Sequence, residues 1–310
     1  MTAVPLDRPA TTRRGDSVFK GLATAAAVMI LVALAGVGIF LTLEGVPALS
    51  AESGALGGKD NIVLYVWPLI YGTLLAAALA ILMAAPLSIG LALVISHYAP
   101  RRLSKPIGYV IDLLAAVPSV VYGLWGIEFL GPRLGQAYGW LAENLGFLPF
   151  FEGPASGSGR TILTAGVVLA VMALPIITAI CREIFSQTPV LHQEAALALG
   201  ATRWEMIRLT VFPYGRSGMI SAVMLGMGRA LGETMAVAMV LSATGVVTIN
   251  LISSVNPSTI AANIALGFPE ASGIKVNVLI FSGLVLFLIT FVVNFLGRLI
   301  AGRGQVKEGR

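Results

Sequence analysis

The sequence TPVLHQEAALALGATRWEMIRLTVFP, residues 188–213, is a polar insert between long apolar segments, and it determines how the rest of the chain is interpreted. It predicts two short helices that meet at Gly200, a residue able to adopt the left-handed conformation that ends a helix. Thr188 is the predicted N-cap of the first helix. Thr202 and Glu205 have the spacing of a capping box, which predicts the start of the second helix. The stretch is therefore a compact helical hairpin suited to being bound by another protein.

The composition is that of a membrane protein. Of the 310 residues, 57% are hydrophobic and only 11% are charged, whereas soluble domains carry about 25% charged residues. The chain has a single cysteine, Cys181, which excludes an intrachain disulfide framework. The sequence also contains no cluster of cysteine and histidine residues that would predict a metal site. The net charge of +5 would ordinarily suggest a nucleic-acid partner. We expect none, because the basic residues follow the ends of apolar segments and so indicate membrane topology.

Six apolar segments are each long enough to cross a bilayer, which takes about 20 residues: residues 21–43, 62–95, 107–130, 161–181, 217–241 and 276–297. They predict an all-α polytopic membrane protein with six transmembrane helices. The transmembrane domain would occupy residues 21–300, between an N-terminal tail at 1–20 and a C-terminal tail at 301–310. The first segment is too long for the apolar region of a signal peptide, so we expect it to remain as a helix.

Lysine and arginine residues gather in alternate regions between these segments. Both tails, the loop after the second segment and the hairpin hold most of them, while the other loops contain only Lys59, Arg133, Arg160 and Lys275. The positive-inside rule therefore predicts that both termini and the hairpin are cytoplasmic. The outer loops would be residues 44–61, 131–160 and 242–275.

Two of the outer loops have distinctive content. Residues 131–160 are rich in aromatic residues, and they fit either an interfacial helix at headgroup level or a lid or docking surface for an external protein. In the loop 242–275, Asn256 is a candidate N-cap. It would precede a short outer helix around Ile260–Leu266.

The fifth segment carries two charges, Arg229 and Glu233, followed by Thr234. A charge in mid-membrane costs on the order of 2.5–3.5 kcal/mol, so each must face protein or water. Four residues apart on one helix, the two side chains are expected to neutralise each other. They form either a buried pair that fixes helix orientation or, the interpretation we favour, a polar station on a solute path. The planar donor fork of arginine suits an oxyanion.

The third segment is interrupted by Pro118, which frees a backbone carbonyl inside the membrane. Ser119 and Tyr122 follow it and are candidates to line the same polar path. We therefore predict a substrate path that includes Arg229, Glu233, Thr234, Ser119 and Tyr122.

The chain lacks the residue patterns of an enzyme. No nucleophile with a partner base is evident, and the glycine-containing stretch 154–161 has no lysine with which to bind nucleotide phosphates. We expect no catalytic residues, metal site or cofactor in this chain. The energy for transport must then come from an ion gradient or from a partner.

The hairpin resembles the EAA loop of ABC importer permeases. Glu194-Ala195-Ala196, Gly200 and Pro213 match that motif in register, while Thr210 and Phe212 replace its usual Ile and Leu. In the family this element is a coupling helix that docks in a groove of the ATPase subunit, which is a helix-in-groove contact. The resemblance implies an ATPase-coupling surface that comprises Leu191, Glu194, Ala195, Ala196, Leu199, Gly200, Trp204 and Pro213.

Further stretches resemble the PstC-type permeases of phosphate ABC importers: 116–126, the outer loop 131–160, 228–235 and 258–262. The resemblance implies a multi-pass protein of the bacterial inner membrane that carries phosphate. It implies a PstA-type partner permease, two PstB-type ATPases that bind ATP and magnesium, and an external PstS-type phosphate-binding protein. Arg229 and Glu233 match charged residues that this family associates with phosphate passage.

Three alternatives remain open from the sequence. The permease could carry another oxyanion, such as sulfate or molybdate, or the chain could be the PstA-type subunit. A gradient-driven secondary transporter is the alternative from a different class, although such proteins often carry inverted repeats, and no convincing internal repeat is found here.

Overall fold

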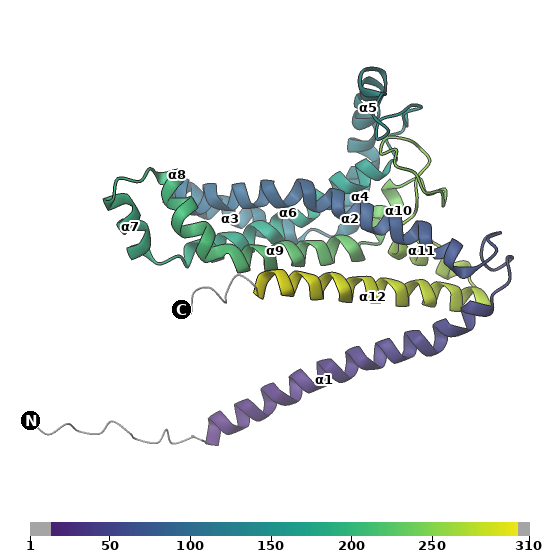
Figure 1. The fold of residues 1–310 in the computed structure, drawn as a ribbon, viewed down its shortest axis with the longest axis horizontal. Coiled ribbons are helices and arrows are strands. Elements are labelled where there is room, and N and C mark those ends of the chain that lie inside the picture. Colours follow the sequence, from purple (N-terminus) through teal and green to yellow (C-terminus); the bar gives the residue numbers. More distant parts are fainter. Residues whose placement is uncertain (1–13, 303–310) are drawn as a thin grey trace, which may run out of the picture.

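A computed structural model describes residues 14–302, in which the regular structure is helical apart from an isolated bridge between Ala243 and Asn256 (Figure 1). The α-helices are α1 (Arg14–Gly45), α2 (Ile62–Leu93), α3 (Arg101–Ala116), α4 (Ser119–Trp125), α5 (Gly131–Leu145), α6 (Ile162–Ser186), α7 (Val190–Ala198), α8 (Arg203–Met206), α9 (Phe212–Gly232), α10 (Met235–Val240), α11 (Ile260–Gly267) and α12 (Ile274–Gly302). Short π-helical turns extend α2, α4 and α8. The all-α prediction is confirmed for the described residues.

Four helical stretches are long and apolar enough to cross a membrane, and they centre on α1, α2, α6 and α12. A fifth is added if α3 and the helix that begins at Ser119, which bend by 93° at their junction, count as one span. The predicted segment 217–241 is also divided, into α9 and α10. Six spanning helices therefore remain a prediction, and the chain termini lie outside the described residues.

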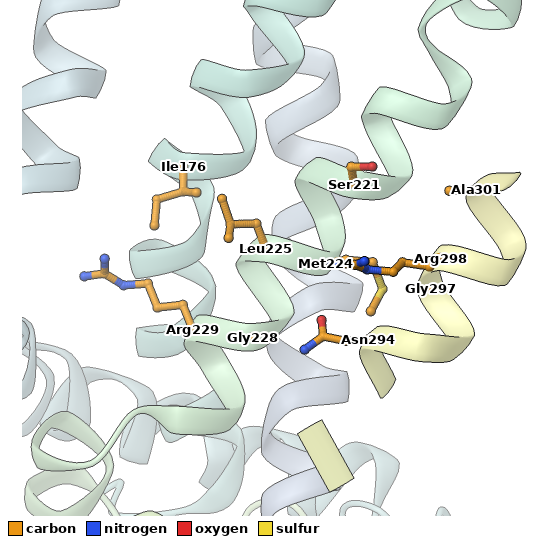
Figure 2. Close-up of a pocket in the computed structure, with 10 residues that line it drawn as sticks. All are labelled: Ile176, Ser221, Met224, Leu225, Gly228, Arg229, Asn294, Gly297, Arg298 and Ala301. Atoms are coloured by element: carbon orange, nitrogen blue, oxygen red, sulfur yellow. The ribbon is translucent and has the colours of Figure 1, made fainter. Parts of the chain in front are cut away.

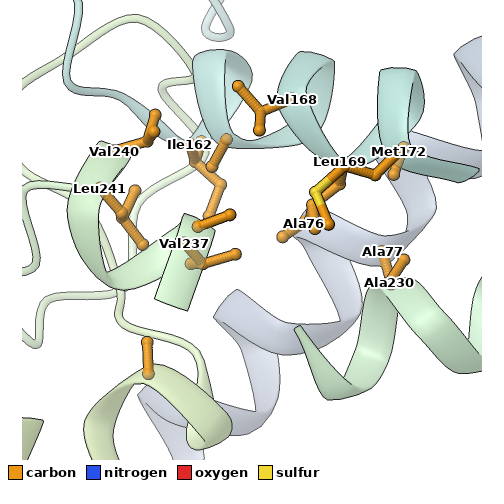
Figure 3. Packing of buried hydrophobic residues seen from close by; sticks show 14 of the residues in the cluster. Ala76, Ala77, Ile162, Val168, Leu169, Met172, Ala230, Val237, Val240 and Leu241 are labelled. Atoms are coloured by element: carbon orange, nitrogen blue, oxygen red, sulfur yellow. The ribbon is translucent and has the colours of Figure 1, made fainter. Parts of the chain in front are cut away.

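The core of the molecule is the packing of α2, α6 and α9. Ala76, Ala80 and Ala84 lie on one face of α2 and are fully buried or nearly so. Gly166 of α6 faces Leu79, where a Cβ atom would lie only 2.9 Å from the leucine Cβ. Small residues let helix backbones approach closely and gain van der Waals contact, which drives helix association in lipid. Figure 3 shows the apolar cluster at the end of this bundle near α10.

The two terminal helices lie outside this core. Gly297 of α12 faces Met224 of α9 so closely that a Cβ atom would overlap the methionine side chain. α1 packs against α12 at Gly38 and Gly45, and Figure 1 shows its N-terminal half diverging from the bundle. The ends of α1 and α12 nearest the chain termini point the same way as α7 and α8 (Figure 1). Their placement on the cytoplasmic side of a membrane stays a prediction.

The loops 131–160 and 242–275 are joined through Asn256, which is fully buried. Its side chain accepts a hydrogen bond from the backbone N–H of Ile162 at 3.0 Å. Its amide nitrogen donates to the carbonyls of Arg160, Ser242 and Ser253. The prediction that Asn256 caps a helix is wrong, because Thr259 is the N-cap of α11. Asn256 instead satisfies backbone groups at the start of α6, just before α6 and within the loop 242–275.

The aromatic residues of the loop 131–160 have mixed surroundings. Tyr138 of α5 is buried, and its hydroxyl group lies 2.8 Å from that of Thr164. Trp140, Phe147 and Phe150 are exposed. Tyr138 therefore anchors α5 to α6, while the exposed residues remain consistent with either the interfacial or the docking interpretation.

Substitution of Asn256 by alanine should destabilise the protein, because it leaves several buried backbone groups without hydrogen bonds. We expect a loss of about 2 kcal/mol or more, measured as a lower midpoint of thermal unfolding in detergent. Asn144→Ala is the matched control, since exposed Asn144 donates only to the Trp140 carbonyl of its own helix. Equal midpoints for the two variants would contradict this role of Asn256.

Candidate functional site

The helix that carries Arg229 stops before it reaches Glu233. α9 ends at Gly232, and Glu233 is extended, with φ −68° and ψ 129°. The carboxylate of Glu233 accepts a hydrogen bond from the backbone N–H of Ala236 at 3.2 Å, at the start of α10. The expected ion pair between Arg229 and Glu233 is therefore wrong. Spacing by four residues aligns two side chains only on a continuous helix, and here the helix is broken.

Arg229 lines a cavity of about 780 Å³ between α6, α9 and α12. Figure 2 shows its side chain on the same side of α9 as Ile176, whereas Asn294 and Arg298 lie on the α12 side. The Nε atom of Arg229 is buried and has no hydrogen-bond partner. An unpaired buried donor is costly, so the hydrogen-bonding capacity of this nitrogen is left unused by the described residues. Arg229 and Arg298 line the cavity from different sides of α9, and the positive charge that they carry attracts anions.

Three lining residues of this cavity, Ser221, Asn294 and Arg298, were not predicted as site residues. In the sequence, Arg298 directly follows the apolar segment 276–297, where a basic residue indicates topology. Asn294 and Arg298 are one helical turn apart on α12, and that spacing was the available clue. Which face of the last segment meets the fifth cannot be derived from spacing alone.

A second break divides the predicted third segment at Val117 and Pro118. Ser119 is the first residue of α4 and is half-buried, and Tyr122 is buried. The hydroxyl group of Tyr122 donates to the carbonyl of Leu114 at 2.8 Å, across the break. In a membrane, backbone that leaves the helix is tolerated only when it is buried in protein or lines a cavity.

The two breaks lie next to each other. A Cβ atom at Gly123 of α4 would lie 3.0 Å from the Cα atom of Ala236, and one at Gly126 would lie 2.7 Å from a methyl group of Val240. α4 and α10 therefore run in parallel, with the second turn of α4 beside the first turn of α10. The structure thus brings Ser119 and Tyr122 close to the break that contains Glu233 and Thr234. Whether these residues contact a solute remains a prediction.

The hairpin has the predicted form in most respects. Gly200 is left-handed with φ 89°, and Thr202 and Glu205 form the capping box. Hydrogen bonds from the backbone N–H and hydroxyl of Thr202 lower the pKa of the Glu205 carboxyl, so the cap stays ionised at neutral pH. The prediction for Thr188 is wrong. Pro189 occupies the N-cap position of α7, and the Thr188 side chain is buried against the bundle.

The predicted coupling residues fall into two groups. Leu191, Leu199 and Trp204 are 77%, 90% and 55% exposed, which is unusual for apolar side chains on a polar loop. Glu194, Ala195, Gly200 and Pro213 are also exposed. Ala196 is half-buried against the apolar cluster at the end of α6. The hairpin therefore exposes apolar side chains and also rests on the bundle, and it projects from one end of the molecule (Figure 1).

Comparison with known proteins identifies the class to which this fold belongs. Residues 84–304 match the family described as binding-protein-dependent transport system inner membrane component, and the chain belongs to that family. It is a multi-pass membrane component of a transport system.

Comparison with individual relatives identifies the type of permease within this family. The phosphate transport system permease protein PstC 2 of Mycobacterium tuberculosis is 44% identical, with 97% of this chain and 98% of that protein covered. The phosphate transport system permease protein PstC of Xylella fastidiosa is 40% identical, with 99% and 97% covered. The chain therefore belongs with the PstC-type permeases.

Solved structures show the same fold at low sequence identity. A chain of a bacterial alginate ABC transporter, in complex with a periplasmic protein bound to an alginate pentasaccharide, is 18% identical. It has a TM-score of 0.57, with 94% of this chain and 96% of that chain covered. A chain of the inward-facing methionine ABC transporter MetNI is 16% identical, with a TM-score of 0.51 and 77% and 94% covered.

Proposed function

We propose that this chain is the permease subunit of an ATP-driven importer and forms part of the transmembrane path for inorganic phosphate. The observation that carries the proposal is the 44% identity, over almost the whole of both chains, to a protein named as a phosphate transport permease. The unpaired, buried Nε of Arg229 on a cavity with a second arginine supplies matching chemistry. Phosphate carries between one and two negative charges at neutral pH and offers several strong acceptor oxygens.

In this proposal six segments cross the membrane, and both termini and the hairpin are cytoplasmic, as the charge distribution predicts. The divided segments 107–130 and 217–241 each cross as a broken helix. Broken helices that place charged side chains and free backbone groups near the centre of the bilayer are common in the substrate sites of transporters.

Arg229 would bind phosphate through its planar fork of N–H donors. Glu233 lies at the nearby break with its carboxylate on the first turn of α10. A carboxylate there weakens the attraction for a dianion and accepts a hydrogen bond from a protonated phosphate oxygen. The pair would therefore bind phosphate firmly enough to select it and weakly enough to release it. Ser119, Tyr122 and Thr234 would line the same passage.

Energy would come from partner subunits. The exposed residues Leu191, Leu199 and Trp204 form an apolar surface suited to the groove of an ATPase. We propose two PstB-type ATPases that bind ATP and magnesium, a PstA-type permease as the second half of the path, and an external PstS-type phosphate-binding protein. Closure of the ATPases on ATP would move the hairpins and switch the side to which the path opens.

Arg229→Gln should lower phosphate uptake about tenfold or more, because a charged donor to the anion is lost. Arg229→Lys should be intermediate, since it keeps the charge but not the fork. Glu233→Gln should also change uptake. The effect of each variant is measured as uptake of radiolabelled phosphate, and assembly of the complex is checked by copurification. Arg216→Gln is the control, on the same helix but away from the cavity. Normal uptake in the Arg229 and Glu233 variants would refute the site.

Gly200→Val should detach or uncouple the ATPase. A Cβ atom at Gly200 meets nothing within 4 Å, so the substitution acts through the backbone alone. A left-handed conformation costs a non-glycine residue about 1–2 kcal/mol, and a β-branched residue will change the angle between α7 and α8. Gly200→Asn is the matched control, because asparagine tolerates this conformation. Equal ATPase copurification and equal transport-linked ATP hydrolysis in both variants would contradict the coupling role of the hairpin.

A further inference from the structure

Within residues 14–302, the salt bridge of the structure joins α3 to α6. Arg182 Nη2 lies 3.6 Å from Asp112 Oδ2, and the two side chains are 29% and 52% exposed. Pairs with this much exposure contribute little to stability. We therefore look for the role of this pair in how it fixes the position of α3 relative to α6.

The guanidinium of Arg182 packs against the backbone of α3. Gly108 lies one helical turn before Asp112, and a Cβ atom at Gly108 would overlap the guanidinium of Arg182. The arginine side chain therefore lies across α3 at the glycine and reaches the carboxylate beyond it. Apolar packing between helices is non-directional and lets them slide past each other by small shear movements. A charged side chain seated across a glycine resists such sliding.

On one side, the pair is connected to the coupling hairpin. Arg182 lies in the last turns of α6, which ends at Ser186 and leads directly into α7. Phe185 is fully buried in a cluster with Met206 and Ile207 of the hairpin. The Gln193 side chain of α7 also donates to the Thr188 carbonyl at 3.1 Å. The end of α6 and the hairpin are therefore packed as one unit.

On the other side, the pair is connected to the broken helix of the candidate path. α3 ends at Ala116, one turn after Asp112. The hydroxyl group of Tyr122 holds the carbonyl of Leu114, so a movement of α3 along its axis carries α4 with it. α4 in turn packs against α10 through Gly123.

We propose that Arg182 and Asp112 are positioning residues that transmit movement of the coupling hairpin to the break at Pro118 and so to the solute path. This inference rests on the proposed function, because it requires an ATPase that moves the hairpin. It assigns neither residue a contact with the solute. Spatial order alone does not establish energetic coupling between sites, so the test is a double-mutant cycle.

The complete transporter complex is reconstituted in liposomes, and the amount of phosphate imported per ATP hydrolysed is measured. Asp112→Asn and Arg182→Gln should each lower this ratio roughly fivefold, the lower end of couplings between sites, while the complex still assembles. The double variant should be no worse than either single one, because both remove the same contact. Gly108→Ala should have the same effect, since it displaces the guanidinium without changing a charge. Asp112→Glu, which keeps the carboxylate, should retain coupling.

Lys105→Gln is the matched control, an exposed basic residue of α3 outside the salt bridge, and its ratio should equal that of the wild type. Unchanged ratios in the three disrupting variants, or effects of Asp112→Asn and Arg182→Gln that multiply in the double variant, would overturn the proposal. If Arg182→Gln does not assemble, Asp112→Asn and Gly108→Ala decide the outcome. If the wild type imports a different oxyanion, the proposed substrate fails, and the same ratio measured with that oxyanion still tests the pair.

Discussion

Inside a bilayer, a backbone that leaves the helical conformation must find partners for its N–H and C=O groups in protein or in water. This constraint explains the arrangement of the centre of the molecule. The chain breaks between α3 and α4 and again between α9 and α10, and the two breaks are adjacent because α4 and α10 pack in parallel through Gly123 and Gly126. The Glu233 carboxylate and the Tyr122 hydroxyl satisfy backbone groups there. Arg229 retains a buried donor without a partner.

The candidate site and the hairpin proposed to bind an ATPase lie in different parts of the molecule. The hairpin is packed on the end of α6 by Phe185, Met206 and Ile207, while its apolar residues Leu191, Leu199 and Trp204 face outward. A force on this outward face reaches α6 first. From α6 it can pass to α9 through the bundle core and to α3 through the salt bridge of Arg182 and Asp112. The chain belongs to a family of membrane components of binding-protein-dependent transport systems. A hairpin for contact with another subunit, separate from the candidate site, fits such a component.

The all-α class, the hairpin turn at Gly200 and the capping box at Thr202 could be predicted, because each depends on local sequence. Arg229 and Glu233 could be picked out as candidate site residues because charges in apolar segments are costly. Their geometry could not. Glycine and proline mark possible breaks, but whether a helix stops at such a residue depends on its tertiary surroundings. The hydrogen bonds of buried Asn256 and the salt bridge between Arg182 and Asp112 likewise join residues far apart in the chain. No local sequence pattern specifies such contacts.

The central claim is that the two breaks line a water-accessible path for phosphate, and cysteine accessibility tests it most directly. Buried Cys181, the single cysteine of the chain, is replaced by serine. Ser119→Cys or Thr234→Cys is then introduced into the assembled complex, with Val292→Cys on the exposed face of α12 as the control. A water-soluble thiol reagent should label positions 119 and 234 but not 292, and phosphate supplied on its external binding protein should slow that labelling. No labelling at either break, or labelling that is indifferent to phosphate, would contradict the account.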